Sequence, residues 1–499
     1  MKKLFSLFII FILFNSSFGQ INKTEDSISL LFIGDIMGHG PQIKAAYNSK
    51  TKKYDYSPVF NGLKPIFESV DFAIANLEVT LAGKPFKGYP QFSSPDNLAK
   101  SCKNSGIDVL VTANNHSCDR GKKGIIRTLK TLDKIGIRHT GTFRDKKERD
   151  TSNLLILKKG NIKIGILNYT YGTNGLPFPS PTIVNIIDEE KIAQDIKQSK
   201  NKNLDKLIVF VHWGKEYESL PNKEQINTAN FLFKQGVDII IGSHPHVLQP
   251  MIYTPQTGKT KEQFIVYSLG NFVSNQRTRK RDGGAMVQLV IKKTKEKTYL
   301  SNKGYILTWV NKTKNETKNK YEVLACKNYT KIENKIDSIA NSKMKIFATD
   351  SRELLTKENK NVPEIPYLLT KKKNLTKVFR FSERDSIGTS IHLLDKVFNT
   401  QKDVNSKFYD KMIEEFNDFL SLNNFVWEKK VWGYNRIYFK KDGTIKYIIY
   451  SIYKNQISKK KEEEYKILLT KFVETYTFPI KAENDFSYYS PIHYIPNKI

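Results

Sequence analysis

The chain has 499 residues, of which 39% are hydrophobic and 12% aromatic, so a disordered or collagen-like chain is excluded. Its 81 basic and 50 acidic residues give a net charge of +31, which favours a polyanionic partner. Only 12 of the basic residues are arginine, whereas a protein that reads phosphates or bases would favour arginine. We therefore expect no nucleic-acid partner.

The first 20 residues combine two lysines, an apolar run from Leu4 to Phe14 and small residues up to Gly19. This pattern is typical of a signal peptide over residues 1–20. The run is short for a bilayer-spanning helix, and retention as an anchor is the alternative. Later segments are too polar to span a bilayer. We expect an exported protein, periplasmic or extracellular and envelope-associated, with no stable transmembrane segment after cleavage.

From residue 27 to about residue 310, short β-rich runs alternate with helical patterns. Several runs are almost entirely apolar, which is typical of strands buried on both faces. The predicted strands are Leu30–Ile36, Asp71–Asn76, Asp108–Ala113, Ile162–Tyr169, Lys206–His212, Val237–Ile241 and Gln263–Ser268, with Ala285–Lys292 and Tyr305–Val310 closing a second sheet. Predicted helices include Gly124–Ile135 and Gln225–Gln235. We expect an α/β domain over residues 21–315.

After residue 310 the amino-acid composition becomes rich in lysine and asparagine. This change predicts a helical linker over residues 316–375. Residues 376–499 are predicted to form a small α+β domain of unknown role. Its predicted elements are a helix around Tyr409–Leu420, a β-rich run Phe425–Trp432, a hairpin turn at Asp442-Gly443 and a helix around Lys460–Glu474.

The chain has three cysteines, Cys102, Cys118 and Cys326. An odd number cannot form a complete disulfide framework. We expect isolated thiols packed as small apolar residues, and a Cys102–Cys118 bond is the alternative.

Polar residues suited to metal binding follow strand after strand, at the ends where α/β folds build their sites. Any one of them could instead cap a helix, hold a turn or pack in the core, but their joint occurrence favours a shared site. Carboxylate, amide and imidazole groups bind hard-to-borderline divalent cations, and no thiolate cluster competes. In His244-Pro245-His246, an extended backbone would place both imidazoles on one side, one for each of two cations.

The blocks GDIM, NLE, NNHxxD, HWGxEY, GxHPH and SLGNF occur in this order within residues 28–310. Together they resemble the bacterial capsule synthesis protein CapA family of the poly-γ-glutamate capsule type, whose fold resembles the calcineurin-like metallophosphoesterases. The resemblance implies a four-layer αββα sandwich, here followed by the small C-terminal α+β domain. It also implies one or two divalent ions of the Mn, Fe, Zn or Mg class.

The resemblance assigns roles to individual residues. Asp35 and His246 would bind the first metal, Glu78 would bridge both metals, and the second metal would take Asn115, His212 and His244. His116 would protonate the leaving group, and Asp119 would orient His116. Further candidates are His39, Asn76, Glu216 and Asn271.

One departure from the metallophosphoesterase pattern concerns the first metal. That pattern has histidine where Met37 stands, and a thioether binds hard cations poorly. The first metal then has three candidate ligands. His39 could supply the missing ligand. The alternative is that His39 is a solvated loop histidine.

These features favour an exported metal-dependent hydrolase over a non-catalytic protein. The reaction would be hydrolysis of a phosphoester or a γ-glutamyl amide, during synthesis, processing or anchoring of an anionic polymer such as poly-γ-glutamate. Envelope capsule-synthesis proteins are the other expected partners. The alternative is a metal-containing envelope protein that binds or exports the polymer: His116 and Asp119 argue against it, and Met37 argues for it.

Overall fold

The computed structural model describes residues 26–258, 260–314, 319–326, 336–365, 377–380, 406–423, 425–428, 430–439, 445–452, 456–476 and 486–494. The expected signal peptide and the Asp442-Gly443 turn lie outside these residues. Within them, no helix combines the length and apolar character that crossing a membrane requires.

The first sheet contains eight strands and includes the N-terminal strand β1 (Asp26–Ile36) near its centre. Its path runs β18-β17-β16-β1-β4-β5-β6, and β15 also pairs with β1. Strands β1, β4, β5 and β6 are mutually parallel, whereas β16, β17 and β18 continue the sheet as antiparallel strands. The bounds are Phe72–Leu77 for β4, Val109–Val111 for β5, Arg138–Thr140 for β6, Asn271–Val273 for β15, Gly283–Lys293 for β16, Thr298–Lys314 for β17 and Asn319–Ala325 for β18.

The second sheet has six strands in the order β13-β14-β12-β11-β9-β8. Its central strands β9, β11, β12 and β14 are parallel, and their almost wholly apolar sequences are buried on both faces. The bounds are Leu155–Lys159 for β8, Ile162–Thr170 for β9, Lys206–His212 for β11, Ile239–Ser243 for β12, Met251–Thr254 for β13 and Gln263–Val266 for β14. Small two-stranded pairings join β2 (Tyr47–Asn48) to β3 (Lys53–Tyr54) and β7 (Thr142–Phe143) to β10 (Ile183–Val184).

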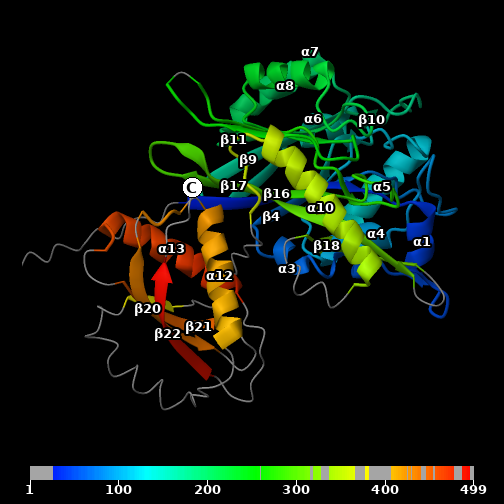
Figure 1. The fold of residues 1–499 in the computed structure, drawn as a ribbon. Coiled ribbons are helices and arrows are strands. Elements are labelled where there is room, and N and C mark those ends of the chain that lie inside the picture. Colours follow the sequence, from blue (N-terminus) through cyan, green and yellow to red (C-terminus); the bar gives the residue numbers. More distant parts are fainter. Residues whose placement is uncertain are drawn as a thin grey trace, which may run out of the picture.

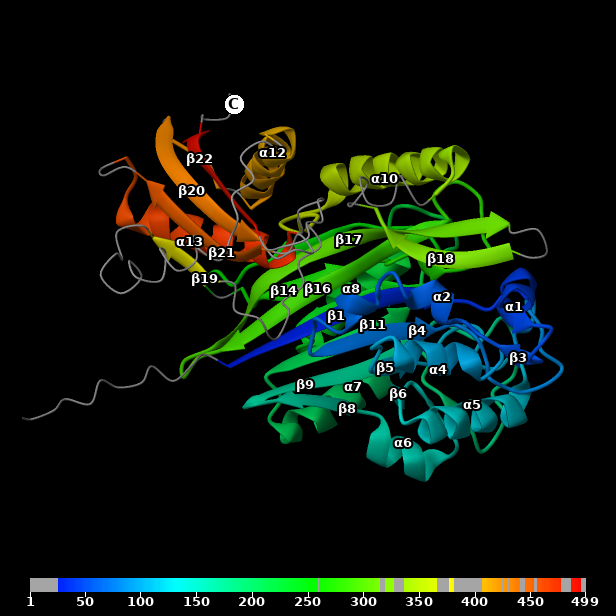
Figure 2. The ribbon, with the colours of Figure 1, turned by 90° about the horizontal axis from the view of Figure 1, so that it is seen from below.

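The two sheets pack face to face, and helices cover their outer faces (Figures 1 and 2). Phe32 of β1 and Phe210 of β11 belong to one apolar core between the sheets. The first sheet is covered by α1 (Gly40–Ala46), α2 (Ser57–Phe60), α3 (Lys64–Phe67) and α4 (Asn97–Asn104), and the second by α7 (Glu189–Ser199) and α8 (Lys223–Gln235). Helices α5 (Gly121–Ile135) and α6 (Lys146–Ser152) and a short 3₁₀ turn, η1 (Lys200–Lys202), complete this unit. The expected four-layer αββα sandwich is confirmed.

The segment expected to be a linker contributes to this sandwich instead. Strand β18 extends the first sheet, and helix α10 (Ser338–Glu358) packs on β17. Met344 and Phe347 of α10 share the inter-sheet core with Trp309. The interpretation of residues 319–326 and 336–365 as linker was therefore wrong. It failed because the end of β17 and the start of β18 are polar, partly exposed strands that carry no apolar run.

The C-terminal unit is α+β, as expected. Its four-stranded sheet has the order β19-β21-β20-β22, with bounds Lys377–Arg380, Ile445–Ile452, Val431–Phe439 and Phe486–Tyr494 respectively. Helices α12 (Ser406–Leu422) and α13 (Lys459–Thr475) share a separate apolar core with this sheet, including Phe416, Trp427 and Tyr465. The predicted β-rich run from Phe425 becomes a strand only at Val431.

All three cysteines are buried and unpaired, as the sequence predicted. Burial raises the pKa of the Cys118 thiol to about 11 and raises the pKa of Cys102 and Cys326 further. They are therefore neutral packing residues at physiological pH.

Two substitutions on α10 test whether this helix contributes to the inter-sheet core. Phe347→Ala should lower the free energy of unfolding by about 3–5 kcal/mol, because Phe347 is 2% exposed in the inter-sheet core. Its neighbour Ile346 is 47% exposed, so Ile346→Ala should change that energy by less than about 1 kcal/mol. Urea unfolding of the full chain, followed by tryptophan fluorescence, measures both. Equal effects would mean that α10 does not support the core.

Candidate metal centre

The strand ends of both sheets meet at one place and bring their polar side chains together. Asp35 is the penultimate residue of β1, Glu78 follows β4, and His212 ends β11. At Asp35 the pairing register shifts toward both β4 and β15, an irregularity that redirects a side chain. The six expected ligands are all buried: Asp35, Glu78, Asn115, His212, His244 and His246.

Two groups of three metal-type donors lie within this cluster and share one residue. Glu78, His244 and His246 form one group, and Asp35, Glu78 and His212 form the other, with the donor atoms of each group within 4.8 Å of one another. Glu78 Oε1 is 3.5 Å from His212 Nε2 and 3.7 Å from His246 Nε2. Glu78 thus lies between two donor sets, which is the position that a bridging carboxylate needs.

Glu78 is a buried carboxylate with an unusual environment. It is fully buried, and neither of its oxygens has a hydrogen-bond partner among the described residues. Burial, followed by repulsion from Asp35, raises the pKa of Glu78 well above its usual range. A buried anion without partners is costly, and a divalent cation would remove that cost.

His212 is held from several directions. Its Nε2 lies 2.9 Å from Asn115 Oδ1, and its Nδ1 lies 3.0 Å from Ser243 Oγ. The His212 and His244 rings are 4.7 Å apart, and His244 Nδ1 is buried with no hydrogen-bond partner among the described residues. Burial lowers the pKa of both histidines well below the usual value. They are therefore neutral near pH 7, the form in which imidazole binds metals.

The His244-Pro245-His246 segment reaches this position by a backbone that the sequence did not predict. His244 has φ of 100° and His246 has φ of 58°, so the segment is not extended as expected. Left-handed conformations of non-glycine residues are strained and concentrate at functional sites. Two residues before His244, position 242 requires glycine, because a Cβ at Gly242 would lie 2.0 Å from the Tyr267 carbonyl oxygen.

Asn76 and Asn271, expected as further candidates, hold ligands in place. Asn76 Nδ2 donates to Asp35 Oδ1 at 2.8 Å. Asn271 Oδ1 is 3.1 Å from His246 Nδ1, while its Nδ2 donates to the Arg281 carbonyl at 2.8 Å. With Nδ1–H donating to Asn271, His246 presents its Nε2 lone pair to Glu78.

His116 lies beside this cluster and outside both donor groups. Its Nδ1 is 2.8 Å from Asp119 Oδ2, and the Phe92 backbone N–H donates to the same oxygen at 2.6 Å. The Phe92 ring packs edge-on against the imidazole with centroids 4.6 Å apart. Asp119 and Phe92 thus fix the ring orientation and leave Nε2 available, as a proton donor requires.

Met37 and two further candidates, His39 and Glu216, lie outside the donor groups. Met37 packs in the apolar core between the first sheet and its helices. His39 caps α1: its Nδ1 is 3.2 Å from Gln42 Oε1 and accepts from the Asn275 N–H, and burial lowers the pKa of His39 to about 4. Glu216 is exposed.

Two aromatic residues at the centre were not selected from the sequence. The Tyr171 ring lies 4.6 Å from the His244 ring, and the Tyr217 ring lies 6.3 Å from that of His246. Tyr171 directly follows β9, so the strand-end rule could have found it. Tyr217 comes from a loop, but it is the last residue of the HWGxEY block, so that motif could have found it.

The donor chemistry at this centre fits divalent cations. Glu78 and His244 present buried donor atoms without partners, and imidazole with carboxylate suits borderline ions. Fold and site together define an αββα protein with a carboxylate–histidine centre at its strand ends. The family model "Bacterial capsule synthesis protein PGA_cap" matches residues 29–276. Comparison with sequence relatives then fixes the family.

The chain is 32% identical over 288 residues to the "PGA biosynthesis protein CapA" of Bacillus subtilis (strain 168), covering 54% of this chain and 69% of that protein. It is 28% identical over 279 residues to the "Capsule biosynthesis protein CapA" of Bacillus anthracis, covering 54% of this chain and 64% of that protein. This chain belongs to the bacterial capsule synthesis protein family. Its match spans about two thirds of each relative's length.

Among solved structures, a calcineurin-like phosphoesterase, YfkN, from Bacillus subtilis aligns at a TM-score of 0.34 and 13% identity, covering 66% of this chain and 98% of that one. A Haemophilus influenzae NAD nucleotidase aligns at a TM-score of 0.35 and 11% identity, covering 83% of this chain and 77% of that one.

Replacing Glu78 separates stability from metal binding. Glu78→Gln should stabilise the metal-free protein at pH 7 by about 1–3 kcal/mol, because it removes a buried carboxyl group that must either carry an unpaired charge or take up a proton on folding. Since the raised pKa favours the protonated form, wild-type metal-free stability should fall as the pH rises above about 4.5, and the variant should lose this dependence. Thermal unfolding with and without Mn²⁺ or Zn²⁺ measures both effects.

The matched control is Glu296→Gln, an identical change at an exposed carboxylate in the turn between β16 and β17. Metal at 100 times its Kd should raise the free energy of unfolding of the wild type and of this control by about 2–3 kcal/mol. It should raise that of Glu78→Gln much less. Equal metal stabilisation of all three proteins would exclude Glu78 as a ligand.

Proposed function

We propose that this protein is a metal-dependent hydrolase of capsule synthesis that acts on an anionic envelope polymer. The observation that carries the proposal is Glu78, a buried carboxylate shared by two donor groups, beside the His116–Asp119 pair. The first feature fits two neighbouring cations, and the second fits a general acid. A protein that only binds polymer needs no positioned proton donor.

Each residue has a task in the proposed reaction. The two donor groups pair His244 with His246 and Asp35 with His212. The family resemblance divides the same residues differently, and we follow it: Asp35, Glu78 and His246 would hold one cation, and Asn115, His212, His244 and the shared Glu78 would hold the other. Asp35 Oδ2 is 3.3 Å from His246 Nδ1, which supports the first set. When bound, such ions supply Lewis-acid activation and neutralise developing negative charge. His116 would donate a proton from Nε2 to the leaving group while Asp119 stabilises the imidazolium, and Asn76 and Asn271 would keep Asp35 and His246 oriented.

The substrate class follows from the family and from charge. The named relatives are capsule and PGA biosynthesis proteins, and the net charge of +31 attracts a polyanion. We infer poly-γ-glutamate as substrate, with hydrolysis of a γ-amide favoured over a phosphoester. Capsule polymer is an envelope material, so we propose that the protein is exported and works with other envelope capsule-synthesis proteins. Cell fractionation with N-terminal sequencing of the mature chain tests the export.

A second candidate is a non-catalytic protein that binds or exports the polymer. The specific observation in its favour is Met37, which packs in the apolar core where a hydrolase of the metallophosphoesterase pattern has a metal-binding histidine. Both proposals place the polymer at the same centre. They differ in whether His116 transfers a proton.

Substitution of His116 separates catalysis from metal binding. His116→Ala should lower kcat by about 10²- to 10⁴-fold on a γ-glutamyl substrate, the usual contribution of a general acid, without changing the metal content. His244→Ala should lose metal and activity together. Asp119→Asn should lie between the wild type and His116→Ala, because it weakens only the support of the imidazole. Steady-state kinetics and metal analysis of the purified full chain give both readouts.

The wild type serves as reference and must first turn over a γ-glutamyl or phosphoester substrate with some divalent metal. Absence of turnover with every metal tested, together with a normal capsule in cells that carry His116→Ala, would refute the hydrolase proposal in favour of the binding protein.

A further inference from the structure

The loop between β15 and β16 concentrates positive charge beside the metal centre. It carries Arg277, Arg279, Lys280 and Arg281, and so holds three of the twelve arginines of the chain. Arg279 is engaged in a two-pronged ion pair with Asp350 of α10. Arg277 stacks over the Trp309 ring at 5.3 Å. The charges in this loop are therefore not equivalent.

Unlike Arg279, Arg281 forms no ion pair with a described acidic residue. Its guanidinium carbon lies 3.3 Å from the centroid of the Tyr217 ring, and no ion pair or side-chain hydrogen bond of Arg281 occurs within the described part of the chain. Stacking uses the face of the guanidinium and leaves the N–H edges for a planar anion. The side chain is partly exposed, so a ligand can reach it.

Hydrogen bonds connect the Arg281–Tyr217 stack to the metal centre. Asn271 donates to the Arg281 carbonyl at 2.8 Å and bonds His246 with its own oxygen. The Tyr217 N–H donates to the Pro245 carbonyl at 2.8 Å, directly between the two histidines. These backbone contacts fix the stack relative to His246, whose ring is 6.3 Å from that of Tyr217. The guanidinium is thus positioned beside the centre without being a ligand.

We propose that Arg281, stacked on Tyr217, binds a carboxylate of the substrate next to the bond held at the metal centre. Two parallel N–H···O bonds from a guanidinium match a carboxylate in geometry and charge. This inference rests on the proposed function, because it names the substrate group that this site recognises. It makes Arg281 a specificity residue for a polymer that carries a carboxylate on each unit.

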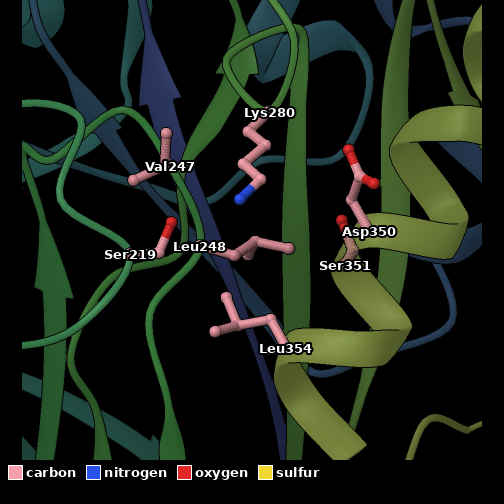
Figure 3. Close-up of a pocket in the computed structure, with 7 residues that line it drawn as sticks. All are labelled: Ser219, Val247, Leu248, Lys280, Asp350, Ser351 and Leu354. Atoms are coloured by element: carbon pink, nitrogen blue, oxygen red, sulfur yellow. The ribbon is translucent and has the colours of Figure 1, made fainter.

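The surrounding charges make Arg281 the cation best placed for this task. Burial, followed by the adjoining Glu216, raises the pKa of Tyr217 to about 12, so this phenol stays neutral. The charge of Glu216 itself repels an incoming anion. Arg281, stacked on Tyr217, places a positive charge near Glu216 and offsets that repulsion. Lys280 instead points into a neighbouring pocket between Leu248 and α10 (Figure 3). A groove of about 660 Å³ continues along α10 and carries both signs of charge.

Arg279 provides a matched control, because it is in the same loop and Arg279→Gln removes the same charge from a cation that is already paired. The probe is a fluorescently labelled γ-linked glutamate oligomer, compared with an oligomer of the same length in which every α-carboxylate is a carboxamide. Binding is measured by anisotropy on the full chain loaded with Mn²⁺. Arg281→Gln should weaken binding of the acidic oligomer by about tenfold or more, the usual value of a charge-assisted pair.

Arg279→Gln should change the affinity less than about threefold, and Arg281→Gln should not change the affinity for the carboxamide oligomer. Metal content should be equal in all proteins. Equal losses in both arginine variants, equal wild-type affinity for the two oligomers, or no binding of the acidic oligomer would each overturn the proposal. Because binding needs no turnover, a protein that binds through Arg281 without hydrolysis would refute only the proposed hydrolase activity.

Discussion

The buried carboxyl group of Glu78, which has no hydrogen-bond partner among the described residues, is the constraint around which the rest of the site is arranged. A buried carboxylate normally collects hydrogen bonds, yet the nearby amides are turned elsewhere: Asn76 to Asp35 and Asn271 to His246. His212 and His244 are kept neutral by burial and provide no positive charge. The side chains around Glu78 therefore orient the other candidate ligands. They leave the ionised form of Glu78 to be stabilised by a bound cation.

Backbone geometry brings these groups together from strands far apart in sequence. A Cβ at Gly34 would lie 2.2 Å from the Gly270 carbonyl oxygen, and a Cβ at Gly242 would lie 2.0 Å from that of Tyr267. Glycine at these two positions lets the strand ends approach closely just before Asp35 and before His244. The left-handed conformation of His244 costs about 1–3 kcal/mol, which the surrounding packing has to offset. Stability is reduced locally to fix the ligand directions.

The sequence predicted the features that hydrophobic periodicity and strand position determine. Strand β11 begins and ends where expected, because apolar residues buried on both faces leave an unambiguous run that ends at His212. Strand β18 was missed, and the helix at α10 was expected only as part of a linker, because their contribution to the core is visible only once β17 lies beneath them. Likewise, the stack of Arg281 on Tyr217 joins two loops 64 positions apart, and no local pattern specifies such a contact.

Met37 and His39 lie in one short segment next to Asp35, and the contacts of both side chains keep them away from that carboxylate. Met37 lies in the apolar cluster beneath the helices, and His39 is occupied by Gln42 and Asn275 at the start of α1. Neither can turn toward Asp35 without giving up these contacts. On the proposed assignment, the cation beside Asp35 and His246 has three protein donors, while its neighbour has four. The shared Glu78 would therefore couple two unequal sites, and the site with fewer protein donors would leave more positions for a substrate oxygen.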